Sequence, residues 1–167
     1  MKRAAFVRWS VSMISVVACL LALAGAWLRP VWHDELYTLA LARLPVGELI
    51  AALLVDSGPP LHYLLCHVLF ALVGWQEGSM LGTLMVRLPS ILAFALIPWV
   101  VWKARPTGDR SGPWGALLVV TWLPLLYFGT EARAYAILAL VNALLWICGP
   151  SWIDRGGRWT ICFAVLA

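Results

Sequence analysis

Long runs of apolar residues, separated by short polar breaks, dominate the chain and predict membrane-spanning helices. A hydrocarbon core about 30 Å thick needs around 20 helical residues to cross it. Residues 9–28 supply such a run without a charged side chain, and further spans are predicted over 87–102, 114–130 and 134–149. Another apolar run starts at 159. Only nine residues of it precede the end at Ala167, so we expect the sequence to be the N-terminal part of a longer protein.

Two stretches between the first and second spans have a different pattern. In residues 35–55, Arg43 and Glu48 interrupt the apolar positions, which is typical of a helix lying in the membrane interface. Residues 59–75 open with a Pro-Pro pair, which suits a first helical turn. We therefore predict two juxtamembrane helices in one long external loop. Together with the spans they predict an all-α, polytopic membrane bundle in a single domain over residues 1–167.

The basic residues orient this bundle, because Lys and Arg in short loops stay on the cytoplasmic side. If 59–75 does not cross the membrane, eight of the 12 Lys and Arg residues face the cytoplasm and four lie outside. If it crosses, five face the cytoplasm and seven lie outside. The first arrangement obeys the rule and predicts a cytoplasmic N-terminus in the inner or plasma membrane. Its four external cations are Arg29, Arg43, Arg87 and Arg133.

The first run also has features of a cleaved signal peptide. Lys2, Arg3 and Arg8 form a basic leader, and the small residues 24–26 would suit a peptidase. The run is nevertheless longer than the roughly 7–15 apolar residues of a signal peptide. Because further apolar runs follow it, we expect it to be retained as an anchor.

Composition narrows the class of protein further. Hydrophobic residues make up 63% of the chain and charged residues 12%, with a mean hydropathy of +0.89, whereas soluble domains average about 25% charged residues. The net charge of +4 is spread between apolar runs, which argues against a nucleic-acid partner and for the lipid bilayer. All four cysteines lie within apolar runs without a CxxC pair, so we interpret them as packing residues.

Acidic residues at two breaks are the candidates for chemistry. Asp34 and Glu35 follow the first span beside His33, and Glu131 lies between the spans 114–130 and 134–149. Ionisable groups at membrane depth are costly and are commonly functional. An alternative interpretation makes Asp34 a helix N-cap and Glu131 part of a hairpin with a local ion pair.

Two arginines and a histidine add possible substrate contacts on the same predicted side. The guanidinium groups of Arg87 and Arg133 match phosphate oxygens in a bidentate fork. Arg87 could equally extend to the lipid headgroups. His62 could donate a hydrogen bond or bind a metal, or be a structural histidine.

Four short motifs occur in an order that resembles the N-terminal module of GT-C glycosyltransferases, with its long first external loop. The nearest branches would be the protein mannosyltransferases, the aminoarabinose transferases and the RgtA/B/C/D-like proteins. The motifs are His33-Asp34-Glu35, Gly58-Pro59-Pro60-Leu61-His62-Tyr63, Arg87-Leu88-Pro89-Ser90 and Glu131-Ala132-Arg133-Ala134-Tyr135-Ala136.

The resemblance implies an activity and a role for each matched residue. A sugar would move, with inversion, from a polyprenyl-phosphate donor to a glycan, lipid or protein acceptor on the outer face. Asp34 would be the catalytic base with Glu35 beside it, and Glu131 would hold the acceptor or, with Asp34, a divalent cation. Arg87 and Arg133 would stabilise the leaving phosphate. The remaining substrate-binding positions would be His33, His62, Tyr63 and Tyr135.

Two other functions are compatible with the same residues. In a transporter or lipid-handling protein, the buried ions would line a substrate path. Broken helices in two related halves would support that function, and the sequence shows no such pairing. A non-catalytic fragment would keep the module without the rest of the enzyme.

Overall fold

A computed structural model of the chain describes residues 2–56, 58–73, 80–104 and 111–154. Within those ranges every regular element is a helix. The predicted span that begins at 159 lies outside the described residues. The helices are α1 (Lys2–Leu28), α2 (His33–Ala42), α3 (Val46–Asp56), α4 (Pro60–Val73), α5 (Met80–Ala104), α6 (Gly112–Thr121), α7 (Leu123–Gly129) and α8 (Tyr135–Asp154).

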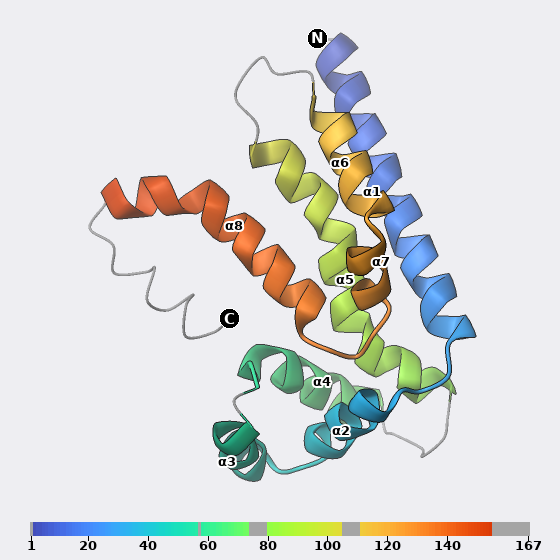
Figure 1. Cartoon of the computed structure of the whole chain (residues 1–167), viewed down its shortest axis with the longest axis vertical. Coiled ribbons are helices and arrows are strands. Elements are labelled where there is room, and N and C mark those ends of the chain that lie inside the picture. The colour runs from blue at the N-terminus through green and yellow to red at the C-terminus, as the bar shows by residue number, and fades with distance from the viewer. Residues whose placement is uncertain (1, 57, 74–79, 105–110, 155–167) are drawn as a thin grey trace.

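The longest helices run up and down in one bundle, with α2, α3 and α4 gathered at one end of it (Figure 1). The C-terminal end of α1 meets the N-terminal part of α5, because Arg87 donates hydrogen bonds to the carbonyls of Ala26 and Arg29. Two helices, over Ala5–Leu28 and Met80–Ala104, are long and apolar enough to cross a membrane, and α6 with α7 makes a third candidate. This arrangement is compatible with a membrane protein.

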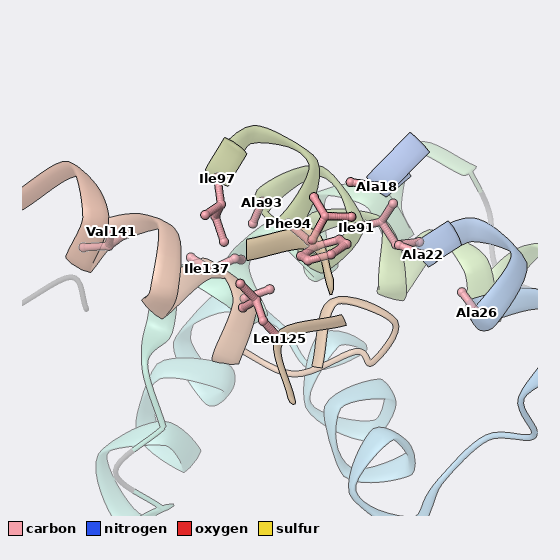
Figure 2. Close-up of a cluster of buried hydrophobic side chains, with 12 residues drawn as sticks. Ala18, Ala22, Ala26, Ile91, Ala93, Phe94, Ile97, Leu125, Ile137 and Val141 are labelled. Carbon is pink, nitrogen blue, oxygen red and sulfur yellow. The ribbon is translucent and has the colours of Figure 1, made fainter. Parts of the chain in front are cut away.

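Small residues let the central helices pack closely. Ala18, Ala22 and Ala26 recur every four residues on α1 and are buried, so they form one helical face. Ile91 and Phe94 of α5 belong to the same buried cluster (Figure 2). Small residues at membrane-helix interfaces allow close backbone approach. Large hydrophobic side chains elsewhere on α1 are exposed, as expected for a surface that faces lipid.

The start predicted for the second long span was wrong. The helix α5 begins at Met80 rather than near Arg87, and Pro89 lies inside it instead of in its first turn. The predicted start had Pro89 in a first helical turn, where proline is tolerated. The helix instead includes Arg87, which is buried and paired with Glu35, so its charge does not end the helix.

Two helices that were expected to be continuous are broken at prolines. The predicted span 114–130 consists of α6 and α7, bent by 68°, and Pro124 lies in the first turn after the break. The predicted helix 35–55 is divided into α2 and α3, with Pro45 between them. A proline has no N–H for the preceding turn, and its ring clashes with that turn. Each break lies at a proline, whereas α5 continues through Pro89 and Pro98.

We predict that Gly129→Ala destabilises the bundle. A methyl group at this position would lie 2.8 Å from Cγ and 2.9 Å from Cβ of Phe94, and overpacking of this kind costs about 1–3 kcal/mol. The matched control is Gly47→Ala, because nothing lies within 4 Å of a methyl group there. Thermal unfolding in detergent should show a lower Tm for Gly129→Ala alone. Equal Tm values for the two variants would contradict the packing of α7 on α5.

Candidate functional site

A buried ion pair between Glu35 and Arg87 lies at the end of the bundle. Arg87 donates from Nε to Glu35 Oε1 at 2.8 Å and from Nη2 to Glu35 Oε2 at 2.5 Å. The two side chains are only 2% and 1% exposed. This two-point geometry is the strongest form of carboxylate–guanidinium contact, and it fixes the start of α2 against α5.

Two backbone N–H groups complete the surroundings of the Glu35 carboxylate. The N–H of Trp32 donates to Oε2 at 3.0 Å, and the N–H of Ala132 donates to Oε1 at 2.8 Å. Burial alone would raise the pKa of Glu35, but the hydrogen bonds from Arg87 and from these two N–H groups lower it below its ordinary value. Glu35 is therefore an ionised carboxylate with four donors, which suits it to hold structure rather than to accept a substrate proton.

The guanidinium of Arg87 also has a partner for each of its N–H donors. Its Nη1 group donates to the carbonyls of Ala26 and Arg29, and Nη2 also donates to Pro30 at 3.1 Å. With the two bonds to Glu35, these contacts use all five N–H donors of the guanidinium. In this arrangement Arg87 has no donor left for a phosphate, the role that the sequence suggested.

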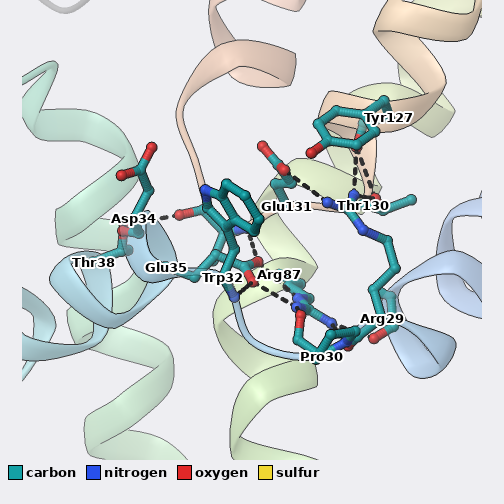
Figure 3. A network of polar contacts seen from close by, with 12 residues as sticks. Arg29, Pro30, Trp32, Asp34, Glu35, Thr38, Arg87, Tyr127, Thr130 and Glu131 are labelled. Carbon is teal, nitrogen blue, oxygen red and sulfur yellow. Dashed lines mark hydrogen bonds and ion pairs between the residues drawn. The ribbon is translucent and has the colours of Figure 1, made fainter.

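Arg29 pairs with Glu131 at the same end of the bundle (Figure 3). Its Nη2 lies 2.9 Å from Glu131 Oε1, and its Nη1 donates to Thr130 Oγ1 at 2.7 Å. The guanidinium also lies 4.1 Å from the ring centroid of Tyr127. Sequence reasoning missed Arg29 as a site residue. The one available signal was its place among the four predicted external cations.

Asp34 is the most open of the three acids in these ion pairs. Its Oδ2 lies 2.9 Å from Arg133 Nη2, and its side chain is 48% exposed. Arg133 Nη1 also donates to the hydroxyl of Tyr63 at 3.4 Å. The residue at the N-cap of α2 is Trp32, so the alternative that Asp34 is an N-cap was wrong.

The segment between α7 and α8 is held by side chains from two other helices. Thr38 Oγ1 donates to the carbonyl of Ala132 at 2.9 Å, and Ser90 Oγ donates to the carbonyl of Arg133 at 2.7 Å. These bonds, and the one from Ala132 to Glu35, fix the backbone on both sides of Arg133. The position of Arg133 beside Asp34 is therefore set by α2 and α5.

His62 is buried below this segment. Its side chain is almost inaccessible, and Nε2 lies 3.7 Å from the sulfur of Cys66. Burial lowers the pKa of His62 to about 4, and the nearby positive charge of Arg133 acts in the same direction. His62 is therefore a neutral packing residue at physiological pH.

The other predicted residues lie at the edge of the cluster. His33 is exposed at the first residue of α2. Tyr135 is 45% exposed at the start of α8, with its ring centroid 4.6 Å from that of Phe128. Across the described part of the chain, no three His, Cys, Asp or Glu side chains gather as metal ligands. Asp34 and Glu131 each face an arginine instead, so this arrangement does not fit the expected divalent cation.

Two apolar grooves lie along the bundle. One, of about 460 Å³, is lined by α4, α5 and α8, including Leu61, Leu88 and Ile137. The other, of about 500 Å³, lies between α1 and α7 and has Arg29 in its wall. Apolar grooves in a membrane bundle are suited to lipid chains.

Comparisons with protein-family models, curated proteins and solved structures gave no match to this chain. The likeness to GT-C glycosyltransferases therefore rests on the four motifs alone.

We predict that Glu35→Gln strongly destabilises the protein. The variant keeps the shape of the side chain but leaves the buried Arg87 without a counter-charge, which costs about 3–5 kcal/mol. The control is Glu48→Gln, because Glu48 is exposed in the first turn of α3. Denaturant or thermal unfolding in detergent measures both. A loss no larger than that of the control would show that the pair is not a main source of stability.

A second prediction concerns acid stability. The unfolded chain binds a proton at His62 near the ordinary pKa of 6.5, whereas the folded chain does so only near 4. The free energy of unfolding should therefore fall as the pH drops from about 6.5 to 4, by up to about 3 kcal/mol from this residue. Below about pH 4.5, the ordinary pKa of Glu, protonation of Glu35 weakens its pair with Arg87. The free energy of unfolding should therefore fall further in that range.

Comparison of His62→Leu with the exposed control His33→Gln isolates this contribution. The unfolding free energy of His62→Leu should lose the decline between pH 6.5 and 4.5, and that of His33→Gln should keep it. The same pH profile in both variants would show that His62 is not the group responsible.

Proposed function

We propose that the chain carries the catalytic end of a membrane glycosyltransferase that uses a polyprenyl-phosphate sugar donor. The observation that carries the proposal is the pair Asp34–Arg133, a half-exposed carboxylate 2.9 Å from a guanidinium at the end of an apolar helix bundle. Within the described residues, Asp34 forms its ion pair through Oδ2. Its other oxygen, Oδ1, would accept the proton of an acceptor hydroxyl bound within hydrogen-bond reach, as a general base does.

Arg133 is the cation best placed for the phosphate. Its Nη1 and Nη2 are held by Tyr63 and Asp34, while its Nε–H is buried without a partner in the described part of the chain. An unpaired buried donor costs free energy. A small movement of the side chain would let a phosphate oxygen accept this hydrogen bond, so a lipid phosphate would remove the cost.

The groove between α4, α5 and α8 supplies a place for the isoprenoid chain. Its walls are almost wholly apolar. Leu61 of the groove lies two residues before Tyr63, and Ile137 lies four residues after Arg133. An isoprenoid in the groove would thus have its phosphate near Arg133 and its tail along the membrane helices.

The proposed reaction is a single displacement. The acceptor oxygen attacks the anomeric carbon as its proton moves to Asp34, and the bond from that carbon to the phosphate oxygen breaks. The phosphate keeps the electron pair and leaves on its lipid. Attack from the side opposite the leaving group inverts the anomeric carbon. The acceptor would be a hydroxyl of a glycan, lipid or protein.

The count of Lys and Arg predicted from the sequence, eight on the cytoplasmic side against four outside, supports a cytoplasmic N-terminus. The Asp34–Arg133 end would then face the outside of an inner or plasma membrane.

One observation favours transport or lipid handling as a second candidate. The helices α6 and α7 form a broken span with a bend of 68°, and the Arg29–Glu131 pair lies beside its end. Discontinuous helices with ions nearby are common in transporters. A transporter would move its substrate in proteoliposomes without forming a glycosidic bond, whereas the proposed enzyme would form one.

We predict that Asp34→Asn lowers sugar transfer at least about 100-fold, the usual contribution of a general base. The assay measures transfer from a panel of polyprenyl-phosphate hexoses and aminopentoses, in membranes that contain the protein. Membrane insertion and Tm should change little, because Asp34 is half exposed. Glu48→Gln is the control for loss of an exposed acid in the same helical region. Undiminished transfer by Asp34→Asn would remove Asp34 from the base role.

A further inference from the structure

Trp32 presents an exposed indole ring next to the Asp34–Arg133 pair. It lies two residues before Asp34, and its side chain is 57% exposed. Figure 3 shows the indole and the Asp34 carboxyl group extending to the same side of the start of α2. Neither the proton transfer to Asp34 nor the phosphate contacts of Arg133 use this ring.

The main chain of Trp32 is held in place by the buried network. Its N–H donates to Glu35 Oε2 at 3.0 Å. Its carbonyl accepts hydrogen bonds from the N–H groups of Glu35 and Leu36 at 3.0 and 3.1 Å. Glu35 is in turn bound to Arg87 and to the N–H of Ala132. The ring therefore extends from a fixed point, and only its two side-chain torsions have to be ordered when a ligand binds.

A second exposed aromatic ring belongs to the segment that supplies Arg133. Tyr135 follows Arg133 by two residues and is half-exposed, and its ring packs at 4.6 Å from that of Phe128. Arg133 Nη2 lies 2.9 Å from Asp34 Oδ2. Both chain segments that form this ion pair therefore also carry an exposed, flat aromatic surface.

We propose that Trp32 stacks on a pyranose ring of the acceptor, so that the acceptor is a glycan. The inference rests on the proposed sugar transfer and names its acceptor class. The face of a pyranose presents C–H groups, which suit the negative face of an aromatic ring. Its hydroxyls project from the rim and can donate to a carboxylate at the side. An indole beside the half-exposed Asp34 offers both surfaces.

The other participants in the reaction do not need this ring. The donor phosphate is assigned to Arg133 and the isoprenoid to the groove between α4, α5 and α8, whose lining residues do not include Trp32. The hydroxyl of a serine side chain or of a glycerolipid has no flat face for an indole to cover. Such an acceptor would leave Trp32 in contact with water while Asp34 removed its proton.

Anchoring in the membrane interface is the other common use of an exposed tryptophan. Trp27 allows the two uses to be separated, because it is 54% exposed and lies near the C-terminal end of α1, at the same end of the bundle. Anchoring predicts similar effects when either ring is removed. Glycan stacking predicts an effect for Trp32 alone.

Saturation-transfer NMR of the full chain, in a detergent without a sugar head group, tests binding without turnover. The probes are the methyl pyranosides of mannose, glucose, galactose, glucosamine and galacturonic acid. Saturation should reach the ring C–H protons of at least one of them. The signal should be lost in Trp32→Leu and retained in Trp32→Tyr and in Trp27→Leu. Both Trp32 variants keep the main-chain hydrogen bonds at this position. Absence of the signal for every pyranoside, or its equal loss in Trp27→Leu, would overturn the proposal.

Transfer kinetics separate this inference from the proposed function. Trp32→Leu should raise the KM for the glycan acceptor roughly fivefold or more, because several tens of Å² of apolar contact are lost. The donor KM and kcat should change little, as for a residue that contributes uniform binding. Transfer to a peptide or lipid hydroxyl, unaffected by Trp32→Leu, would overturn the glycan acceptor and leave the sugar transfer standing. Absence of transfer to every class of acceptor would contradict the proposed function, and the acceptor role of Trp32 with it.

Discussion

The buried pair Glu35–Arg87 is the contact on which the geometry of the site depends. It joins the end of α1, the start of α2 and the N-terminal part of α5, and through Ala132 it reaches the segment before α8. Removing two charges from water is costly, and their attraction offsets the cost only when the remaining hydrogen bonds are made. Here both Glu35 and Arg87 make these further hydrogen bonds. One carboxylate thus fixes four parts of the chain, and Asp34 and Arg133 are each adjacent in sequence to a residue of this network.

The three ion pairs differ in burial, and burial separates their roles. Glu35–Arg87 is inaccessible and saturated with hydrogen bonds, so it can only position its neighbours. Arg29–Glu131 is partly open on the arginine side. Asp34–Arg133 is the most open of the three, and a substrate could reach it without unfolding the core. Neighbouring acids such as Asp34 and Glu35 thus have opposite environments because successive residues of a helix face different directions.

Sequence reasoning predicted the helical class correctly, because long apolar runs leave few alternatives in a bilayer. It failed where one residue determines whether a helix continues or breaks. The helix α5 continues past Arg87 because this arginine is paired with Glu35. Glu35 lies 52 residues away in the sequence, so no local pattern shows the pairing. Pro45 and Pro124 were present in the sequence, but whether a proline bends or ends a helix depends on packing. The acids of the site were identified from their places after the spans, while the pairing of Arg29 with Glu131 depends on tertiary structure.

In the proposed reaction, the pairing of Asp34 with Arg133 couples proton transfer to departure of the phosphate. Before reaction the carboxylate offsets part of the positive charge of Arg133. When Asp34 takes the proton of the acceptor, that offset is lost at the moment when negative charge develops on the leaving phosphate. A fixed cation beside developing charge is the arrangement that stabilises a transition state most. Arg133 would therefore interact more strongly with the transition state than with the bound donor, without having to move far.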